Sequence, residues 1–148
     1  MSNSKILSKI SDKTIKVGVV GLGYVGLPLA VSFAVGGVEV LGFEKSEKKT
    51  NSINTGRNYI GDVADNDLEM VVKETKKLSA TMDFSRIREC DAIIVCVPTP
   101  LDEFKKPDMS YIEQSCIDIS KNMKSETFIG LESTTYPTTT EDFMKPII

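Results

Sequence analysis

The sequence predicts an α/β fold in which helices cover both faces of a doubly wound parallel sheet. Strand and helix patterns alternate five times along the 148 residues. The expected strands are continuous apolar runs, as in strands buried on both faces, and do not alternate with polar residues. A glycine-rich turn joins the first strand to the first apolar helix. This order favours about five parallel strands joined by right-handed crossovers.

Composition indicates one ordinary globular domain and excludes several classes of protein. Hydrophobic residues make up 41% of the chain, charged residues 26%, and the net charge is −3. The mild acidity offers no electrostatic basis for binding nucleic acid or an anionic membrane, and no apolar run reaches membrane-spanning length. Histidine is absent, and Cys90, Cys96 and Cys116 lack metal-ligand spacing. We therefore expect no metal site, no disulfide framework and a reducing, cytoplasmic location.

Residues 1–14 form a polar segment that carries Ile6, Leu7 and Ile10 at helical spacing. The segment lacks the continuous apolar core of a signal peptide. It predicts an N-terminal helix or tail packed on a domain that occupies residues 15–148.

The glycine-rich turn follows a β-branched strand at 15–20. Gly21, Gly23 and Gly26 have the spacing G-x-G-x-x-G, and an apolar helical pattern continues to residues 36–37. In a strand–turn–helix unit, the first glycine permits the tight turn, the second lets a pyrophosphate approach the backbone, and the third brings the helix close to the strand. The helix N-terminus then attracts phosphate. A purely structural turn remains the alternative.

The second strand, 38–43, ends at Glu44, about twenty residues beyond the glycines. A carboxylate at this place accepts hydrogen bonds from the ribose of a bound adenosine. A lysine-rich helix is expected over 46–54. A second helix from Asp67 has its apolar face at Leu68, Val71, Val72 and Thr75.

The remaining elements follow the same alternation. A less apolar third strand is expected at 78–82, near a sheet edge, and Asp83 is expected to cap a short helix that runs to residue 88. The fourth and fifth strands are expected at 91–97 and 127–131. Between them, Ser110 and Glu113 have the spacing of a capping box, and Thr138 and Glu141 repeat it before a last helix.

Ligands of such sheets bind beyond the carboxyl ends of the strands. The loops that follow the strands are therefore the ones that carry chemistry. They lie at 21–26, 44–49, 98–108 and 132–138.

These loops resemble the N-terminal domain of the UDP-glucose/GDP-mannose dehydrogenase family. The matching stretches are GLGYVGLPLA at 21–30, CVPTPLDE at 96–103, KPDMSY at 106–111 and LESTTYP at 131–137. The last two look most like the branch that acts on UDP-N-acetylhexosamines. The resemblance implies a Rossmann-like fold, NAD as cofactor, and oxidation of the C6 hydroxyl of a nucleotide sugar to a uronate for surface polysaccharide synthesis.

The resemblance also implies site residues. Gly21, Gly23, Tyr24, Val25 and Gly26 would bind the cofactor at the turn. Glu44 would bind the ribose where the family usually has aspartate. Lys49 would lie beside the adenosine, and Thr99 would contact the cofactor. Thr134 would lie near the nicotinamide and position a water for catalysis. As alternatives, Thr99 and Thr134 are strand-end threonines that bond nearby backbone, and Lys49 belongs to a solvated helix face.

The resemblance has one local departure and leaves part of the family unmatched. The family commonly has glycine after the YP of LESTTYP, whereas this chain has Thr138. We therefore expect the backbone at Thr138 to avoid left-handed angles. The nucleophilic cysteine, lysine and asparagine of the family come from later segments, so we expect a domain truncated before its end, inactive alone, from an enzyme that is a homodimer at full length. The rival hypothesis is a stand-alone, non-catalytic dinucleotide-binding or regulatory module.

Overall fold

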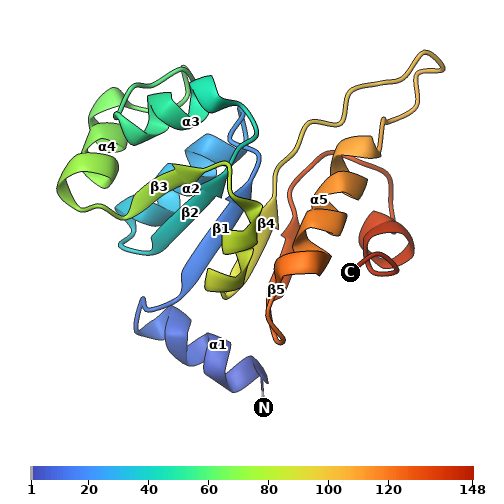
Figure 1. The fold of residues 1–148 in the computed structure, drawn as a ribbon, viewed down its shortest axis with the longest axis horizontal. Helices are drawn as coiled ribbons and strands as arrows, with labels where there is room; N and C mark the ends of the chain where they lie inside the picture. Colours follow the sequence, from blue (N-terminus) through green and yellow to red (C-terminus); the bar gives the residue numbers. More distant parts are fainter. Residues whose placement is uncertain (1) are drawn as a thin grey trace.

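The computed structural model describes residues 2–148 and contains a five-stranded parallel sheet of order β3-β2-β1-β4-β5. This confirms the predicted fold class and places the third strand at an edge (Figure 1). The strands begin and end within two residues of the expected bounds. They are β1 Lys16–Val20, β2 Glu39–Phe43, β3 Leu78–Thr81, β4 Ala92–Val95 and β5 Phe128–Leu131.

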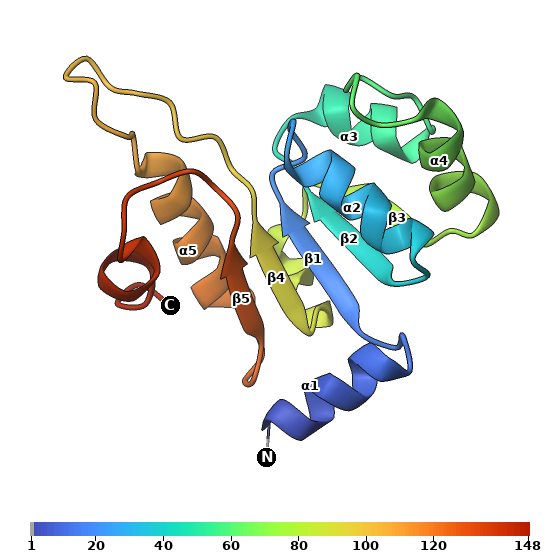
Figure 2. The ribbon, with the colours of Figure 1, turned by 180° about the vertical axis from the view of Figure 1, so that it is seen from behind.

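Helices and single helical turns connect the strands (Figures 1 and 2). The α-helices are α1 Ser2–Ser11, α2 Gly26–Val35, α3 Glu47–Asn54, α4 Asp65–Glu69 and α5 Ser110–Asn122. A 3₁₀ helix, η2, spans Phe84–Glu89, and π-helical turns η1 and η3 span Met70–Glu74 and Thr139–Met144. Among residues 2–148, no helix has the length and apolarity needed to cross a membrane.

The sheet separates two apolar layers because successive side chains of a strand point to opposite faces. In β1, Val17 and Val19 pack with α2, α3 and α4, whereas Val20 packs with η2, α5 and η3. In β4, Ile93 and Val95 are fully buried in the second layer. Burial on both faces explains why the central strands are continuous apolar runs in the sequence.

The strand order places the functional end of the sheet. The chain builds outward from β1 to β2 and β3, then returns to the other side of β1 for β4 and β5. The direction of winding therefore reverses between β1 and β4, which is where ligands bind in sheets of this kind. All strands are parallel, so the loops that follow them meet at one edge of the sheet.

Helix α1 lies at the opposite end of the sheet from these loops, near the amino ends of the strands (Figure 2). Lys9 of α1 and Lys124 donate to the same Oδ1 of Asp91, at 2.6 and 2.7 Å, while the Lys16 amide donates to Oδ2 at 3.1 Å. Ile6 packs on the core, whereas Leu7 and Ile10 are at least half exposed.

Three local predictions were wrong in detail. The helix expected from Asp67 passes into the π-helical turn η1 at Met70, which leaves Thr75 exposed. Ser110 does not cap α5, because it is the first residue of the helix and Met109 occupies the N-cap position; Asp108 Oδ1 accepts from the Ser110 amide at 2.9 Å. Thr138 makes no side-chain capping bond to η3.

The expectation that the backbone at Thr138 avoids left-handed angles was also wrong, because Thr138 adopts the left-handed conformation with φ 70° and ψ 3°. The residues that follow explain why. Buried Thr139 donates from its hydroxyl to the Tyr136 carbonyl at 2.7 Å, and Met144 at the end of η3 is 2% exposed. Packing of η3 therefore imposes on Thr138 a geometry that glycine adopts without strain.

Candidate functional site

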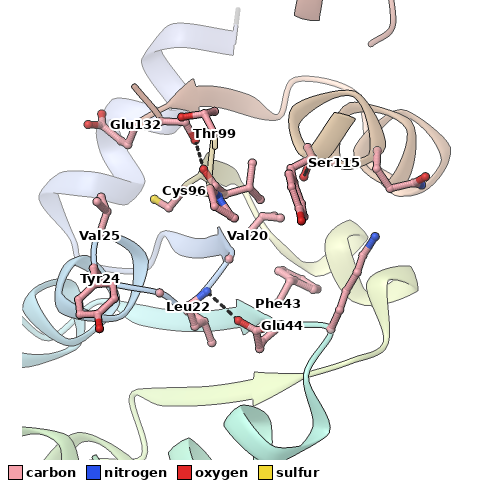
Figure 3. Close-up of a pocket in the computed structure, with 18 of the residues that line it drawn as sticks. Val20, Leu22, Tyr24, Val25, Phe43, Glu44, Cys96, Thr99, Ser115 and Glu132 are labelled. Atoms are coloured by element: carbon pink, nitrogen blue, oxygen red, sulfur yellow. Dashed lines mark hydrogen bonds between the residues drawn. The ribbon is translucent and has the colours of Figure 1, made fainter. Parts of the chain in front are cut away.

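A cleft of about 920 Å³ lies at the carboxyl edge of the sheet, over the point where the winding reverses (Figure 3). It is lined by the loops after β1, β2, β4 and β5 and by the first turns of α5. The structure brings together there all of the predicted site residues except Gly26, the first residue of α2. Those lining the cleft are Gly21, Gly23, Tyr24, Val25, Glu44, Lys49, Thr99 and Thr134.

The three glycines of the turn meet three different environments. Gly21 has φ +89°, and a Cβ there would lie 2.9 Å from the Cys96 carbonyl oxygen. A Cβ on Gly26 would lie 1.8 Å from the Gly21 carbonyl oxygen, so only glycine lets α2 lie this close to β1. A Cβ on Gly23 would meet no atom within 4 Å. Gly23 thus has no packing reason to be glycine, and its bare backbone faces open space.

The start of α2 complements that space. Its N-cap residue, Val25, makes no side-chain capping bond. The Leu27 amide already donates to the Gly23 carbonyl at 3.0 Å and Pro28 has no N–H, so the first turn offers the Gly26 N–H and the positive end of the helix dipole. Tyr24 and Val25 are 78% and 53% exposed at the mouth of the cleft. A backbone surface open at Gly23 and next to an uncapped helix N-terminus fits a pyrophosphate.

Glu44 lies where β2 ends, with its side chain 12% exposed. Its Oε2 accepts from the Leu22 amide at 3.2 Å and its Oε1 from the Ser46 amide at 3.0 Å (Figure 3). Lys49 Nζ lies 3.9 Å from Oε2. A carboxylate has about four lone-pair sites, so acceptor capacity remains for ribose hydroxyls. Lys49 compensates part of the negative charge.

The loops after β4 and β5 are joined by two side chains. Thr99 Oγ1 donates to the Thr134 carbonyl at 2.6 Å, and Ser133 Oγ donates to the Val97 carbonyl at 2.7 Å. The Thr99 hydroxyl thus has the backbone-bonding role that was the alternative to cofactor contact. This bond leaves the acceptor capacity of the hydroxyl unused, because a hydroxyl that donates once still accepts. The bond fixes Thr134 on the cleft wall.

Sequence reasoning missed several cleft residues. Glu132 and Ser133 belong to the same loop as Thr134, and that proximity was the available signal. Four residues of α5 also line the cleft, and they are Ser110, Tyr111, Gln114 and Ser115. Ser110 and Tyr111 end the KPDMSY match, which was the available signal for them, whereas Gln114 and Ser115 belong to no motif. Tyr59 lies behind the turn, where its hydroxyl donates to the Leu22 carbonyl at 2.6 Å.

The cysteines are not arranged as nucleophiles. Burial raises the pKa of Cys90 and Cys96 to about 12 and that of Cys116 to about 11. All three are buried, and only Cys96 lines the cleft. A reactive thiol needs a lowered pKa and exposure. Within residues 2–148, no three Cys, Asp or Glu side chains gather closely enough to share a metal ion.

The parallel sheet, the glycine turn and the acid at the end of β2 define a dinucleotide-binding domain of the Rossmann type. A family model described as the NAD binding domain of the UDP-glucose/GDP-mannose dehydrogenase family matches residues 15–148. The chain belongs to this family. NAD is the cofactor of its domain.

Similar proteins span several members of the family. The chain is 38% identical over 139 residues to the UDP-N-acetyl-D-glucosamine 6-dehydrogenase of Pseudomonas aeruginosa, covering 92% of this chain and 31% of the relative. The NDP-N-acetyl-D-galactosaminuronic acid dehydrogenase of Methanosarcina mazei is 36% identical, with a TM-score of 0.81, and the match covers 99% of this chain and 33% of that protein. The UDP-D-ManNAc dehydrogenase of Pyrococcus horikoshii is 32% identical, with a TM-score of 0.83, and the match covers 90% of this chain and 32% of that protein. The chain thus spans about a third of these relatives.

Proposed function

We propose that this chain is the NAD-binding part of a nucleotide-sugar 6-dehydrogenase that oxidises the C6 hydroxyl of a UDP-N-acetylhexosamine to the uronate. The observation that carries the proposal is the cleft, in which the open backbone at Gly23 lies between Glu44 and the loops after β4 and β5. The motifs of those loops and the family match support the same function.

Each part of the cleft has a proposed role. Glu44 accepts hydrogen bonds from the adenosine ribose. Lys49, whose Nζ lies 3.9 Å from Glu44 Oε2, is beside the adenosine. The turn from Gly21 to Gly26 binds the pyrophosphate. Thr99 and Thr134 hold the nicotinamide end, and Thr134 orients a water at the reacting carbon. When bound, NAD supplies the hydride acceptor, while the protein contributes position and exclusion of water.

The sugar class rests on the names of the similar proteins. Those reported above are named for N-acetylglucosamine, N-acetylgalactosaminuronic acid and N-acetylmannosamine. All three are N-acetylhexosamine derivatives, so we propose a UDP-N-acetylhexosamine as the substrate, used to supply uronate units for a surface polysaccharide. In line with the family, the full-length enzyme would be a homodimer.

The 148-residue chain is expected to bind NAD but to turn nothing over. Oxidation beyond the aldehyde needs a thiolate to form a covalent intermediate, and the cysteines here are buried with raised pKa values. The chain also has no histidine to act as a base. Incubation with NAD and UDP-N-acetylglucosamine, UDP-N-acetylgalactosamine, UDP-glucose or GDP-mannose should form no NADH above background. Sustained growth of NADH absorbance would contradict this expectation.

A chimera tests the proposed function directly. This chain replaces the equivalent domain of the P. aeruginosa relative, which supplies the rest of the enzyme. The chimera should form NADH with a UDP-N-acetylhexosamine, and the same chimera carrying Gly23→Val should not. A chimera that binds NAD but oxidises no nucleotide sugar would favour the non-catalytic dinucleotide-binding module.

A further inference from the structure

Tyr59 lies in an ordered loop between α3 and α4 to which the cofactor-binding motif assigns no role. Asn58 builds this loop: its Oδ1 accepts from the Ile60 amide at 2.9 Å, and its Nδ2 donates to the Val63 carbonyl at 2.6 Å. Ile60 is buried, and the Tyr59 ring packs half-buried on the same core. The loop therefore holds Tyr59 at a defined place behind the glycine turn.

Residue Leu22, at the centre of the turn, is anchored at three points. Its side chain is fully buried over β2, where a Cβ on Gly42 would lie 2.5 Å from Leu22 Cδ1. Its amide donates to Glu44, and its carbonyl accepts from the Tyr59 hydroxyl at 2.6 Å. The first two anchors fix Leu22 itself. The Tyr59 hydroxyl fixes the peptide plane that joins Leu22 to Gly23.

We propose that Tyr59 is a positioning residue for dinucleotide binding, which holds the Leu22–Gly23 peptide so that the Gly23 N–H faces the pyrophosphate. The inference rests on the proposed function. In a planar trans peptide the C=O and N–H groups point in opposite directions. A Leu22 carbonyl held by Tyr59 therefore directs the Gly23 N–H away from Tyr59, and Gly23 lines the cleft whereas Tyr59 does not.

Gly23 makes this restraint necessary. Glycine allows a wide range of backbone angles, so the peptide before it rotates more easily than one before a residue with a Cβ. A rotated peptide would present its carbonyl oxygen to an anion in place of its N–H. Burial and the nearby Glu44 carboxylate raise the pKa of Tyr59, so the hydroxyl stays protonated and remains a donor.

The test compares Tyr59→Phe with Tyr136→Phe as a matched control. Tyr59→Phe removes only the hydroxyl and keeps the ring, which packs on the core and lies 5.9 Å from Lys49 Nζ. Tyr136 is exposed and does not line the cleft. Calorimetry should show NAD affinity about 3- to 10-fold weaker in Tyr59→Phe, which is the size expected from one hydrogen bond. Tyr136→Phe should leave the affinity unchanged.

A second ligand separates positioning from general damage. Adenosine lacks the pyrophosphate, so a chemical-shift titration should give the same adenosine affinity in Tyr59→Phe and in the unsubstituted chain. Equal weakening of adenosine and NAD, or unchanged NAD affinity, would overturn the role of Tyr59. Failure of the unsubstituted chain to bind NAD at all would instead overturn the proposed function, and the inference with it.

Discussion

Of the glycines in the turn after β1, Gly23 is the one at which a substitution should affect ligand binding and leave the fold intact. A side chain at Gly21 or Gly26 would collide with backbone atoms at 2.9 and 1.8 Å, so changes there damage the turn itself. A side chain at Gly23 would enter open space at the cleft. Gly23 is therefore the position at which a single substitution tests the ligand without disturbing the protein.

Gly23→Val should abolish NAD binding while the fold is kept. The isopropyl group would occupy the space that the pyrophosphate needs, and the neighbouring contacts have no means to replace a blocked anion site. Calorimetry measures binding, and circular dichroism measures the fold. Gly61→Val is the matched control, because a Cβ on Gly61 also meets no atom within 4 Å and Gly61 lies outside the cleft. Undiminished NAD binding by Gly23→Val would mean that the turn is only structural.

Among the elements, η3 has a strained backbone at its N-cap residue. Thr138 is β-branched, yet its backbone adopts the left-handed conformation. Two hydrogen bonds hold it there. The Thr139 hydroxyl donates to the Tyr136 carbonyl at 2.7 Å, and the Asp142 amide donates to the Thr138 carbonyl at 2.8 Å. The cost of a left-handed conformation is about 1–2 kcal/mol for a residue with a Cβ. Packing of the buried Thr139 and Met144 outweighs that cost.

Thr138→Gly should therefore stabilise the chain by about 0.5–1 kcal/mol, since glycine adopts this conformation without strain but loses more chain entropy on folding. Urea denaturation measures the free energy of unfolding. Thr140→Gly is the matched control, because Thr140 is exposed inside η3, where glycine should destabilise by a similar amount. Destabilisation by Thr138→Gly would show that the left-handed geometry is not the source of strain.

Besides the packing of Ile6 on the core, the Asp91 carboxylate attaches helix α1 to the amino end of the sheet through Lys9. Burial would raise the pKa of Asp91, but hydrogen bonds from Lys124, Lys9 and the Lys16 amide outweigh it and lower the pKa to about 2. The folded pKa lies below the unfolded value of about 3.9. This contribution to stability is therefore complete above about pH 4 and is lost as the pH falls towards 2.

Asp91→Asn should lower the free energy of unfolding by about 1–3 kcal/mol at pH 7, because the two lysines lose their shared partner. The variant should also lose less stability than the unsubstituted chain between about pH 4 and pH 2. Urea denaturation across that range measures both effects. Asp62→Asn, at an exposed carboxylate, is the control. Parallel pH profiles for Asp91→Asn and the unsubstituted chain would contradict the assignment.

For the whole molecule, the sequence was sufficient for the parallel sheet and for the grouping of the cleft loops. Apolar runs mark strands buried on both faces, and parallel strands bring their following loops to one edge. Details set by long-range packing were not predictable. The left-handed Thr138 follows from burial of η3, and the bond from Tyr59 to Leu22 joins residues 37 positions apart. Neither has a local signal.

The cleft as a whole is expected to discriminate between cofactors. Glu44 would accept from the ribose hydroxyls of NAD and repel the 2′-phosphate of NADP, and Lys49, 3.9 Å away, compensates only in part. Like-charge repulsion of this kind is worth about 1–3 kcal/mol, which is roughly a 5- to 150-fold difference in affinity. In Glu44→Ala this preference should disappear.

Calorimetric titration of the 148-residue chain with NAD and with NADP is the decisive experiment for the NAD site. The predicted result is saturable binding of one NAD per chain, tighter than that of NADP. Tighter binding of NADP, a preference for NAD that survives in Glu44→Ala, or no binding of NAD would contradict the claim that this cleft is an NAD site.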